Sequence, residues 1–591
     1  MKHLVRKLTT RALPLALAAA GVAALPVTTG AAAAAAPSHG TLLTSAPADV
    51  RLGTGAPAVN AWHISYASTD SRGGANTVTG TVLVPATAWS GGSARPLVAY
   101  APGTHGLGSK CAPSAQLAAG TDYETANIVA LLRKNWAVVV TDYAGYGAGR
   151  TPTYLAGRSQ GQAVLDSALA AFQVPGSGLS GSAMTAVWGY SQGGQSAGWA
   201  GQLEPSYASS LNLAGVVAGG VPGDFKASAR YLNGSTGASF LLQGVVGLAA
   251  EYPDKIPFDE LVNDAGRAAV ADAKGKCVFE TLFDYINDDI KQYTAGGRTL
   301  DELMAIGSVG EVLGDQDLGG TKIQAPVYQY HGQADEILPL DQAISLKKRY
   351  CSRGTAVKFD VYPSEHIATQ FQAAPNVTKW LTDRFDGKPQ LVGDCLNILP
   401  PPRSTANPGG GDFVVSLNKW LLKGGLRLKT LDETVLMPEG STFTADTDLT
   451  ARRLEGSLAV PTFLEHLRVI GLPVQVRIGL KSEGTSGTVS LDDAGRLAVH
   501  GKALATVEIV SAGELGIHIP VGCRTAEPVE FALDFEGPVS ALGSGGLTFS
   551  GTTAFPSLTD CGLFGPTLSL AFSGPGNGYT FTVVPPEPKS Y

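Results

Sequence analysis

Between residues 63 and 218, short apolar runs alternate with longer stretches of helical character. The alternating runs 63–68 and 78–84 are joined by a turn-rich connection and predict an antiparallel hairpin. Compact apolar runs predict buried strands, and the stretches between them predict helices. We expect strands at 97–100, 136–142, 186–188 and 214–218, and helices at 123–135, 160–172 and 194–203. This alternation indicates a mostly parallel sheet with helices on both faces.

The alternation stops near residue 221 and resumes near residue 327. The intervening segment, about 221–321, contains apolar helical patches interrupted by glycine and no strand pattern. Strand patterns return at 327–331 and 357–362, each followed by a predicted helix. An insertion of this size between two strands of one sheet is typical of a cap over a binding site. We therefore predict an α/β domain over 38–398 that carries a large helical cap.

The composition changes again after this domain. Residues 399–412 are proline-rich at their start and glycine-rich at their end, which is typical of a linker. Beyond it, alternating runs such as 474–478, 529–533 and 567–572 recur between glycine-containing turns. This pattern predicts a smaller all-β domain over 413–591, with a sandwich-like architecture.

Residues 1–36 have the three parts of a secretory signal peptide. A basic start precedes the apolar stretch 13–25, and small residues with several A-x-A cleavage points follow it. The basic residues are Lys2, Arg6, Lys7 and Arg11. The apolar stretch is shorter than the ~20 residues that a membrane-spanning helix needs. No other stretch is long and apolar enough, so we expect a secreted, extracellular protein with no transmembrane segment.

Size and charge narrow the class of protein. A chain of 591 residues is too long for one ordinary hydrophobic core, which agrees with at least two domains. Hydrophobic residues make up 44% and charged residues 16%, as in a globular protein with a sparsely charged surface. The formal net charge is −7, and removal of the basic leader makes it more negative. This balance argues against nucleic acid and anionic membranes as partners and leaves neutral lipids open.

Export makes the six cysteines candidates for disulfide bonds. They are Cys111, Cys277, Cys351, Cys395, Cys523 and Cys561. None has C-x-x-C spacing, so redox and zinc roles are not indicated. Pairing neighbours along the chain is the simplest arrangement, although six cysteines allow many others. The sequence also lacks H-E-x-x-H and Walker A motifs, so we expect no metal and no cofactor.

The segment Gly189-Tyr190-Ser191-Gln192-Gly193 has the pattern G-x-S-x-G. It follows the predicted strand 186–188 and precedes the predicted helix 194–203, so the serine stands at a sharp strand-to-helix turn. In such a nucleophile elbow the serine has a strained backbone, and a side chain at either glycine would collide with its neighbours. Ser191 is therefore the candidate nucleophile of an α/β-hydrolase, a fold that the antiparallel hairpin at the start also favours.

A histidine base must follow the nucleophile and the acid in the chain order of this fold. Of the nine histidines, His366 fits best, because it lies in the loop after strand 357–362. His331 closes a strand, where a structural role is expected. The alternative for His366 is an ordinary surface position.

The candidate acid lies in the loop after strand 327–331. Asp335 comes four residues past the end of this strand and would orient the imidazole and stabilise its charged form. Glu336 is the other carboxylate of the loop, and we expect it to be solvated. The alternative is that both residues only decorate a turn.

An oxyanion hole requires two backbone N–H groups. The first is expected from Gln192, directly after the nucleophile. The second is expected from the loop 102–106 after strand 97–100, with Thr104 preferred and His105 as the alternative.

Four motifs together resemble one known family, the secretory lipases of the lipase A type, first known from Candida yeasts and with many actinobacterial members. They are Ala101-Pro102-Gly103-Thr104-His105-Gly106, Cys111-Ala112-Pro113-Ser114, Thr141-Asp142-Tyr143-Ala144-Gly145-Tyr146-Gly147 and Gly189-Tyr190-Ser191-Gln192-Gly193-Gly194. The resemblance covers about 58–395. It implies an α/β-hydrolase fold, a helical cap, carboxylic-ester hydrolysis without a metal, and a triad of Ser191, Asp335 and His366. It also implies a bond between Cys111 and Cys277, and it gives no function for the β-domain.

These observations lead to a secreted serine esterase of lipase type as the main hypothesis, with a lipid or related ester as its substrate. An acyltransferase or a peptidase of the same fold, or a cell-surface binding protein with a vestigial hydrolase domain, are the alternatives. For the β-domain we expect contact with an insoluble substrate or a cell envelope, and the alternative is a purely stabilising role.

Overall fold

The computed structural model describes residues 37–591 except 401, 407–411, 470, 515–516 and 563–564. The predicted signal peptide lies outside the described residues. In the described part, no helix is long and apolar enough to cross a bilayer.

The first part of the chain is built on a ten-stranded sheet. In spatial order its strands are β1 (Leu42–Pro47), β2 (Val59–Thr69), β3 (Ala75–Pro85), β5 (Ala137–Thr141), β4 (Leu97–Ala101), β6 (Met184–Tyr190), β7 (Asn212–Gly219), β8 (Val327–Gly332), β9 (Val357–Tyr362) and β21 (Lys589–Ser590). The strands β2 and β3 form the predicted antiparallel hairpin, and the strands from β5 to β9 are parallel. This is the predicted α/β-hydrolase arrangement.

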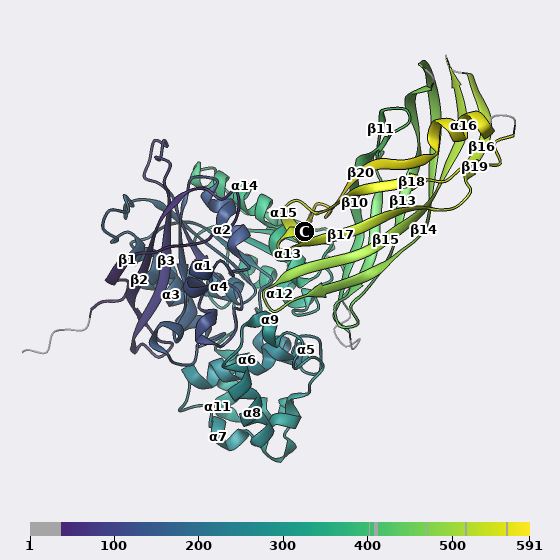
Figure 1. Cartoon of the computed structure of the whole chain (residues 1–591). Helices are drawn as coiled ribbons and strands as arrows, with labels where there is room; N and C mark the ends of the chain where they lie inside the picture. The colour runs from purple at the N-terminus through teal and green to yellow at the C-terminus, as the bar shows by residue number, and fades with distance from the viewer. Residues whose placement is uncertain (1–36, 401, 407–411, 470, 515–516, 563–564) are drawn as a thin grey trace, which may run out of the picture. The chain divides into compact units, whose positions relative to one another are not determined.

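Helices cover both faces of this sheet (Figure 1). One face packs against α3 (Gly157–Ala171), α4 (Gln192–Tyr207) and α12 (Leu340–Ser352), and the other against α1 (Pro113–Ala119), α2 (Thr125–Leu132) and α14 (Ala374–Phe385). Successive side chains of a strand point to opposite faces of the sheet, so each strand contributes to both hydrophobic cores. In β4, Leu97 and Ala99 face the first set of helices, whereas Val98 and Tyr100 face the second.

The segment between β7 and β8 is helical, and its described residues form no strand. Its helices are α5 (Phe225–Leu232), α6 (Ala238–Glu251), α7 (Phe258–Leu261), α8 (Asp264–Ala273), α9 (Val278–Thr281), α10 (Leu300–Met304) and α11 (Gly307–Gly314). The disulfide Cys111–Cys277 joins it to the loop before α1. We call this segment the cap.

The last part of the chain forms a second, eleven-stranded antiparallel sheet. Its strands are β10 (Val414–Leu428), β11 (Glu433–Leu436), β12 (Thr442–Asp448), β13 (Arg453–Val469), β14 (Leu472–Leu491), β15 (Arg496–Glu514), β16 (Ile517–Thr525), β17 (Val529–Pro538), β18 (Leu547–Phe555), β19 (Leu558–Thr559) and β20 (Gly574–Val584). Two short helices, α15 (Ala541–Ser544) and α16 (Gly565–Phe572), interrupt it. We call residues 413–584 the β-domain, and the prediction of an all-β structure is confirmed.

The β-domain is one curled sheet around an apolar interior, rather than the two packed sheets of the predicted sandwich. The curl brings β17 next to β18 and β20, where the Tyr579 hydroxyl donates to the carbonyl of Ala532 at 2.9 Å. The hydroxyl of Thr553 also donates to the carbonyl of Glu530, at 2.6 Å. The inward-facing side chains, such as Trp420, are fully or almost fully buried.

The prediction of a strand at 567–572 is wrong, because this stretch belongs to helix α16. Its sequence satisfies both patterns, since apolar residues alternate and also recur at i, i+3 and i+4. The helix turns Leu568, Ala571 and Phe572 toward the interior of the β-domain. Leu570 instead points outward and is 76% exposed.

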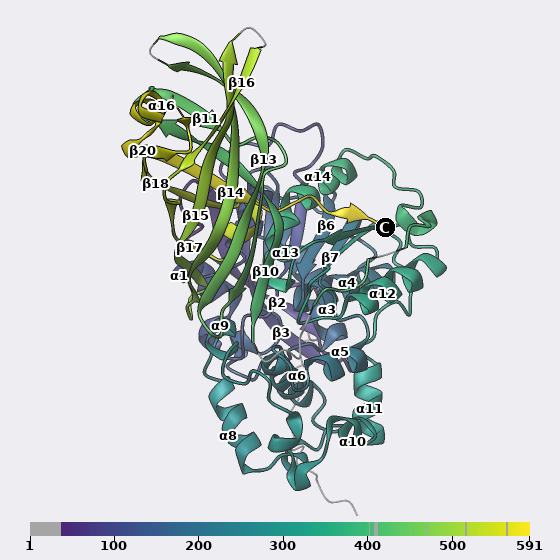
Figure 2. The same ribbon diagram turned by 90° about the vertical axis from the view of Figure 1, so that its right-hand side faces the viewer.

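The end of the chain returns to the first sheet. In β21, Lys589 and Ser590 pair antiparallel with Val361 and Asp360 of β9. The N–H of Tyr591 donates to the carbonyl of Phe359 at 3.0 Å. Figure 2 shows this yellow strand, which carries the C terminus. The α/β sheet therefore includes a strand that the predicted boundaries assign to the second domain.

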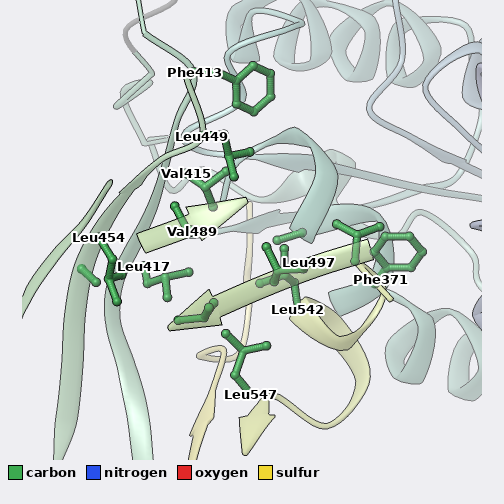
Figure 3. Close-up of a cluster of buried hydrophobic side chains, with 14 of the residues drawn as sticks. Phe371, Phe413, Val415, Leu417, Leu449, Leu454, Val489, Leu497, Leu542 and Leu547 are labelled. Atoms are coloured by element: carbon green, nitrogen blue, oxygen red, sulfur yellow. The ribbon is translucent and has the colours of Figure 1, made fainter. Parts of the chain in front are cut away.

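A buried apolar cluster lies where the β-domain contacts helix α13 (His366–Gln372) (Figure 3). Phe371 of α13 lies beside Leu497 and Leu542 of the β-domain. Helix α15 approaches so closely that a Cβ atom at Gly543 would lie 2.2 Å from the Cβ of Phe371. This contact connects the β-domain to the helix that begins at His366.

Three disulfide bonds join cysteines that are neighbours along the chain. Besides Cys111–Cys277, they are Cys351–Cys395 and Cys523–Cys561. The second bond ties α12 to the segment after α14, and the third lies within the β-domain.

Candidate active site

Ser191 stands at the turn between β6 and α4 with a strained backbone. Its φ of 58° and ψ of −119° are values that L-residues rarely adopt. A Cβ at Gly189 would lie 2.1 Å from the carbonyl oxygen of Gly193, and a Cβ at Gly193 would lie 1.9 Å from that of Ala101. Both glycines of the motif are thus required by close backbone packing, as a nucleophile elbow demands.

The structure brings Asp335 and His366 together. His366 Nδ1 lies 2.7 Å from Asp335 Oδ2, and both side chains are almost completely buried. Asp335 Oδ1 accepts the N–H groups of Ile337 and Leu338 at 3.0 and 2.7 Å. Burial alone would raise the pKa of Asp335, but the neighbouring imidazoles and these N–H bonds hold it below its usual range. The ionised carboxylate fixes the proton on Nδ1 and leaves Nε2 as the basic nitrogen.

The link between this pair and the elbow runs through Tyr190. The Tyr190 hydroxyl donates to the carbonyl of His366 at 2.7 Å, and the two rings lie 4.9 Å apart between centroids. In the described part of the chain, the His366 ring contacts Asp335 and forms no hydrogen bond with Ser191 Oγ. Such contacts often tighten only when a substrate is bound.

His331 and Glu336 complete the surroundings of the pair. His331 Nε2 donates to the carbonyl of Leu338 at 2.9 Å, and burial lowers the pKa of His331, so it supports the acid loop as a neutral ring. The expectation that Glu336 is solvated is wrong, because it is only 5% exposed. Its Oε2 accepts the N–H of His366 at 3.2 Å. The first N–H groups of a helix lack partners within the helix, which explains why a carboxylate is buried here.

The backbone N–H groups of the candidate oxyanion donors have no acceptor within the part of the protein that the structure describes. Gln192 is the first residue of α4, so its N–H has no intrahelical acceptor. In the described part of the chain, the N–H groups of Gln192, Thr104 and His105 donate to no acceptor. The two alternatives of the sequence, Thr104 and His105, therefore both retain a free N–H.

An apolar cavity of about 120 Å³ lies between the elbow and the cap. Ser191 and Gln192 line one side of it. Leucine, isoleucine, valine and phenylalanine side chains of the cap, such as Phe240, Leu242 and Leu313, provide most of the remaining wall. Such a lining suits a hydrocarbon chain and offers few hydrogen bonds to a polar ligand.

Comparison with known proteins agrees with this geometry. Residues 112–393 match the model of the family described as "Secretory lipase". Lipase 2 of Candida albicans is 31% identical over 371 residues, which cover 58% of this chain and 77% of the relative. This chain belongs to the secretory lipase family. A secreted triacylglycerol lipase of Malassezia furfur is also 31% identical, over 49% of this chain and 63% of the relative.

Solved structures share the fold of this secretory lipase. Candida antarctica lipase A in its closed state matches with a TM-score of 0.54 and 24% identity, over 63% of this chain and 88% of that one. The rice cell wall degrading esterase LipA of Xanthomonas oryzae matches with a TM-score of 0.50 and 20% identity, over 59% of this chain and all of that one. The family match ends at residue 393, before the β-domain begins.

Proposed function

We propose that this chain is a secreted serine hydrolase of lipase type, which cleaves acylglycerols or related lipid esters through an acyl-enzyme. The observation that carries the proposal is the strained Ser191 at the edge of an apolar cavity, with the buried Asp335–His366 pair next to the elbow. The names of the Candida and Malassezia relatives support the substrate class and the secretion. The three disulfide bonds also suit an oxidising compartment.

In the proposed reaction, Ser191 Oγ attacks the ester carbonyl while His366 Nε2 accepts its proton. Asp335 stabilises the imidazolium that forms. The negative charge on the former carbonyl oxygen is stabilised by the N–H groups of Gln192 and Thr104. His366 then gives the proton to the departing alcohol, which leaves an ester of Ser191. Water, deprotonated by the same histidine, hydrolyses this ester and releases the fatty acid.

We further propose that the β-domain contacts insoluble lipid substrate, with a cell envelope as the alternative. The support is a set of exposed apolar side chains on β11, β14, β16 and α16. They are Leu436, Leu472, Ile519 and Leu570, which are 61%, 66%, 52% and 76% exposed. Figure 1 shows β11, β16 and α16 toward the same end of the β-domain. Exposed apolar side chains that gather at one end of a domain are typical of surfaces that bind lipid or another partner.

The test of the main proposal is a Ser191→Ala variant assayed with p-nitrophenyl esters. Its kcat is expected to fall at least about 10,000-fold, because nucleophile, base and acid act as one unit. The melting temperature and circular dichroism are expected to stay close to those of the wild type. Full activity in the variant would contradict the proposal. Product analysis with added alcohols and with peptides distinguishes hydrolysis from acyl transfer and from peptidase activity.

A further inference from the structure

Three buried titratable side chains lie in or beneath the loop 102–106, which supplies the Thr104 N–H. His105, Asp122 and Glu124 are 2%, 7% and 0% exposed. The reaction described above gives them no role. Buried charges are costly unless they are paired or hydrogen-bonded, so their partners indicate what they do.

Glu124 connects two segments of the proposed site. Its Oε2 accepts the N–H of Gly103 at 2.9 Å, and its Oε1 accepts a hydrogen bond from the Gln370 side-chain amide. Gly103 belongs to the loop 102–106, which we call the oxyanion loop. Gln370 lies on α13, one turn after His366 and hence on the same side of that helix. A single carboxylate thus ties the oxyanion loop to the helix of the base.

His105 holds the next peptide, Gly103–Thr104, whereas Glu124 accepts the N–H of the Pro102–Gly103 peptide. Its Nδ1 lies 3.0 Å from the carbonyl oxygen of Gly103, and its Nε2 lies 3.3 Å from Asp122 Oδ2. The carbonyl and the N–H of a trans peptide point in opposite directions. By fixing the Gly103 carbonyl toward the buried cluster, His105 therefore turns the Thr104 N–H away from it.

The remaining polar groups of Thr104 are also occupied. Its carbonyl accepts the Tyr123 hydroxyl at 2.9 Å, and its Oγ1 lies 2.8 Å from the Tyr154 hydroxyl. Gly103 is also closely packed, because a Cβ there would lie 3.0 Å from both Glu124 Oε1 and the Tyr123 hydroxyl. The N–H of Thr104 is the one polar group of this residue without an acceptor among the described residues.

We propose that Glu124 is a positioning residue for ester hydrolysis, which holds Gly103, and through it the adjoining Gly103–Thr104 peptide, at a fixed place relative to the helix of His366. This inference rests on the proposed function and deepens it. Glu124 does not touch the reacting atoms. It keeps the second oxyanion donor and the base in one rigid arrangement, and such preorganised donors act mainly on the transition state.

The test is a Glu124→Leu variant of the full chain, which keeps the approximate volume and removes both acceptors. We expect kcat on p-nitrophenyl butyrate to fall about 100-fold, as for the loss of one oxyanion donor, with KM within about twofold. Binding of a trifluoromethyl ketone, whose adduct with serine carries an oxyanion, is expected to weaken by a similar factor. Glu124→Gln keeps an acceptor for Gly103 and is expected to recover most of the loss.

Asp166→Leu is the control, because it removes another fully buried carboxylate that lies on α3. It is expected to lower the melting temperature without changing kcat or ketone binding. If Glu124→Leu does not fold, Gln370→Leu removes only the tie to α13, and kcat is expected to fall about tenfold. The inference would be overturned if the variant tested, Glu124→Leu or Gln370→Leu, had the same kcat and the same ketone affinity as the Asp166→Leu control. Active wild type with inactive Ser191→Ala would show that the proposed function still stands, whereas wild type without esterase activity would overturn both.

Discussion

The cap and the β-domain both lie outside the α/β core, but they contact different sides of the candidate site. The cap surrounds Ser191 with apolar side chains of α5, α6 and α11. The β-domain and the segments around it contact the elements of the acid and the base. The N–H of Thr405 donates to the carbonyl of Gln333 at 2.9 Å, α15 packs on Phe371, and β21 extends the sheet beside β9.

This difference separates two tasks. The cap lies within the region that matches the secretory lipase family, and it lines most of the apolar cavity, which we propose holds the acyl chain. The β-domain lies beyond that region, and it supports the segments that lead to Asp335 and His366. A side chain that disturbs the cap should thus change which esters are cleaved, whereas one that disturbs the β-domain contact should change the rate for all esters.

Among changes in the cap and the β-domain, the largest effect is expected from Gly543→Leu. The new side chain collides with Phe371 and shifts α13, and small displacements of catalytic groups can reduce rates about 100-fold. We expect a loss of this size in kcat for soluble esters of every chain length. The matched control is Gly545→Leu, two residues away, where an added Cβ meets nothing within 4 Å. Equal activity of the two variants would contradict the proposal that the β-domain supports the candidate site.

A smaller and selective effect is expected from Gly244→Leu in α6 of the cap. Gly244 lines the cavity, and an added Cβ meets only Leu155, at 3.4 Å, so a leucine fits there and fills space. We expect hydrolysis of p-nitrophenyl palmitate to fall about tenfold to 100-fold, with that of the acetate unchanged. Gly314→Leu on α11, where a Cβ meets nothing within 4 Å, is the control. A uniform loss across chain lengths would contradict the assignment of the cavity to the acyl chain.

The end of the β-domain that carries α16 is expected to matter only for insoluble substrate. The triple variant Leu472→Ser, Ile519→Ser and Leu570→Ser removes apolar side chains that are more than half exposed. Loss of this apolar contact is expected to reduce adsorption to triolein emulsion about fivefold or more, with soluble esters hydrolysed as before. Leu43→Ser, a change at another exposed leucine, is the control. Unchanged adsorption of the triple variant would leave the β-domain with its supporting role alone.

The smallest effect is the pH dependence of stability, and it arises from the oxyanion loop next to the cap. The oxyanion loop contacts the cap, since the carbonyl of His105 accepts the N–H of Val278 at 3.0 Å. Burial raises the pKa of Glu124 to about 8 from an ordinary 4.5. Although burial lowers the pKa of His105, Asp122 and Glu124 raise it to about 9 from 6.5. At a pH between the ordinary and the raised pKa of either residue, the folded chain binds more protons than the unfolded chain.

The free energy of unfolding is therefore expected to decrease as pH rises from about 4.5 to 8 for Glu124, and from about 6.5 to 9 for His105. Calorimetry should show a melting temperature that falls by a few degrees over this range. Glu124→Gln should flatten the first part of the decline and reduce the second, because it removes one of the charges that raise the pKa of His105. A variant with the same pH profile as the wild type would contradict the raised pKa of Glu124.

Local patterns predicted much of the α/β domain. The hairpin, the buried strands and the elbow depend on neighbouring residues, so their sequence periods and glycines were sufficient. Helix α16 was missed because its residues satisfy the strand and helix periods together. Strand β1, which pairs with β2, was not predicted, because an edge strand gains stability from a partner that periodicity does not reveal.

The parts of the site that escaped prediction depend on contacts between distant residues. Asp335 and His366 could be proposed as acid and base from chain order and strand ends, and the structure brings them together. Glu124 and Gln370 are 246 residues apart, and no local signal connects them. Glu336 was expected in solvent because a carboxylate in a loop is usually hydrated, and only the fold reveals the unpaired N–H of His366 that it binds. The return of β21 to β9 depends on the tertiary structure in the same way.

The central claim is that Ser191, activated by the His366–Asp335 pair, carries the acyl group. The most direct measurement is peptide mapping by mass spectrometry after inactivation with a long-chain alkyl p-nitrophenyl phosphonate. We predict one adduct per chain, on the peptide that contains Ser191, with labelling strongly slowed in His366→Ala. A wild-type chain that is folded but unlabelled, or labelled at another residue, would contradict the claim.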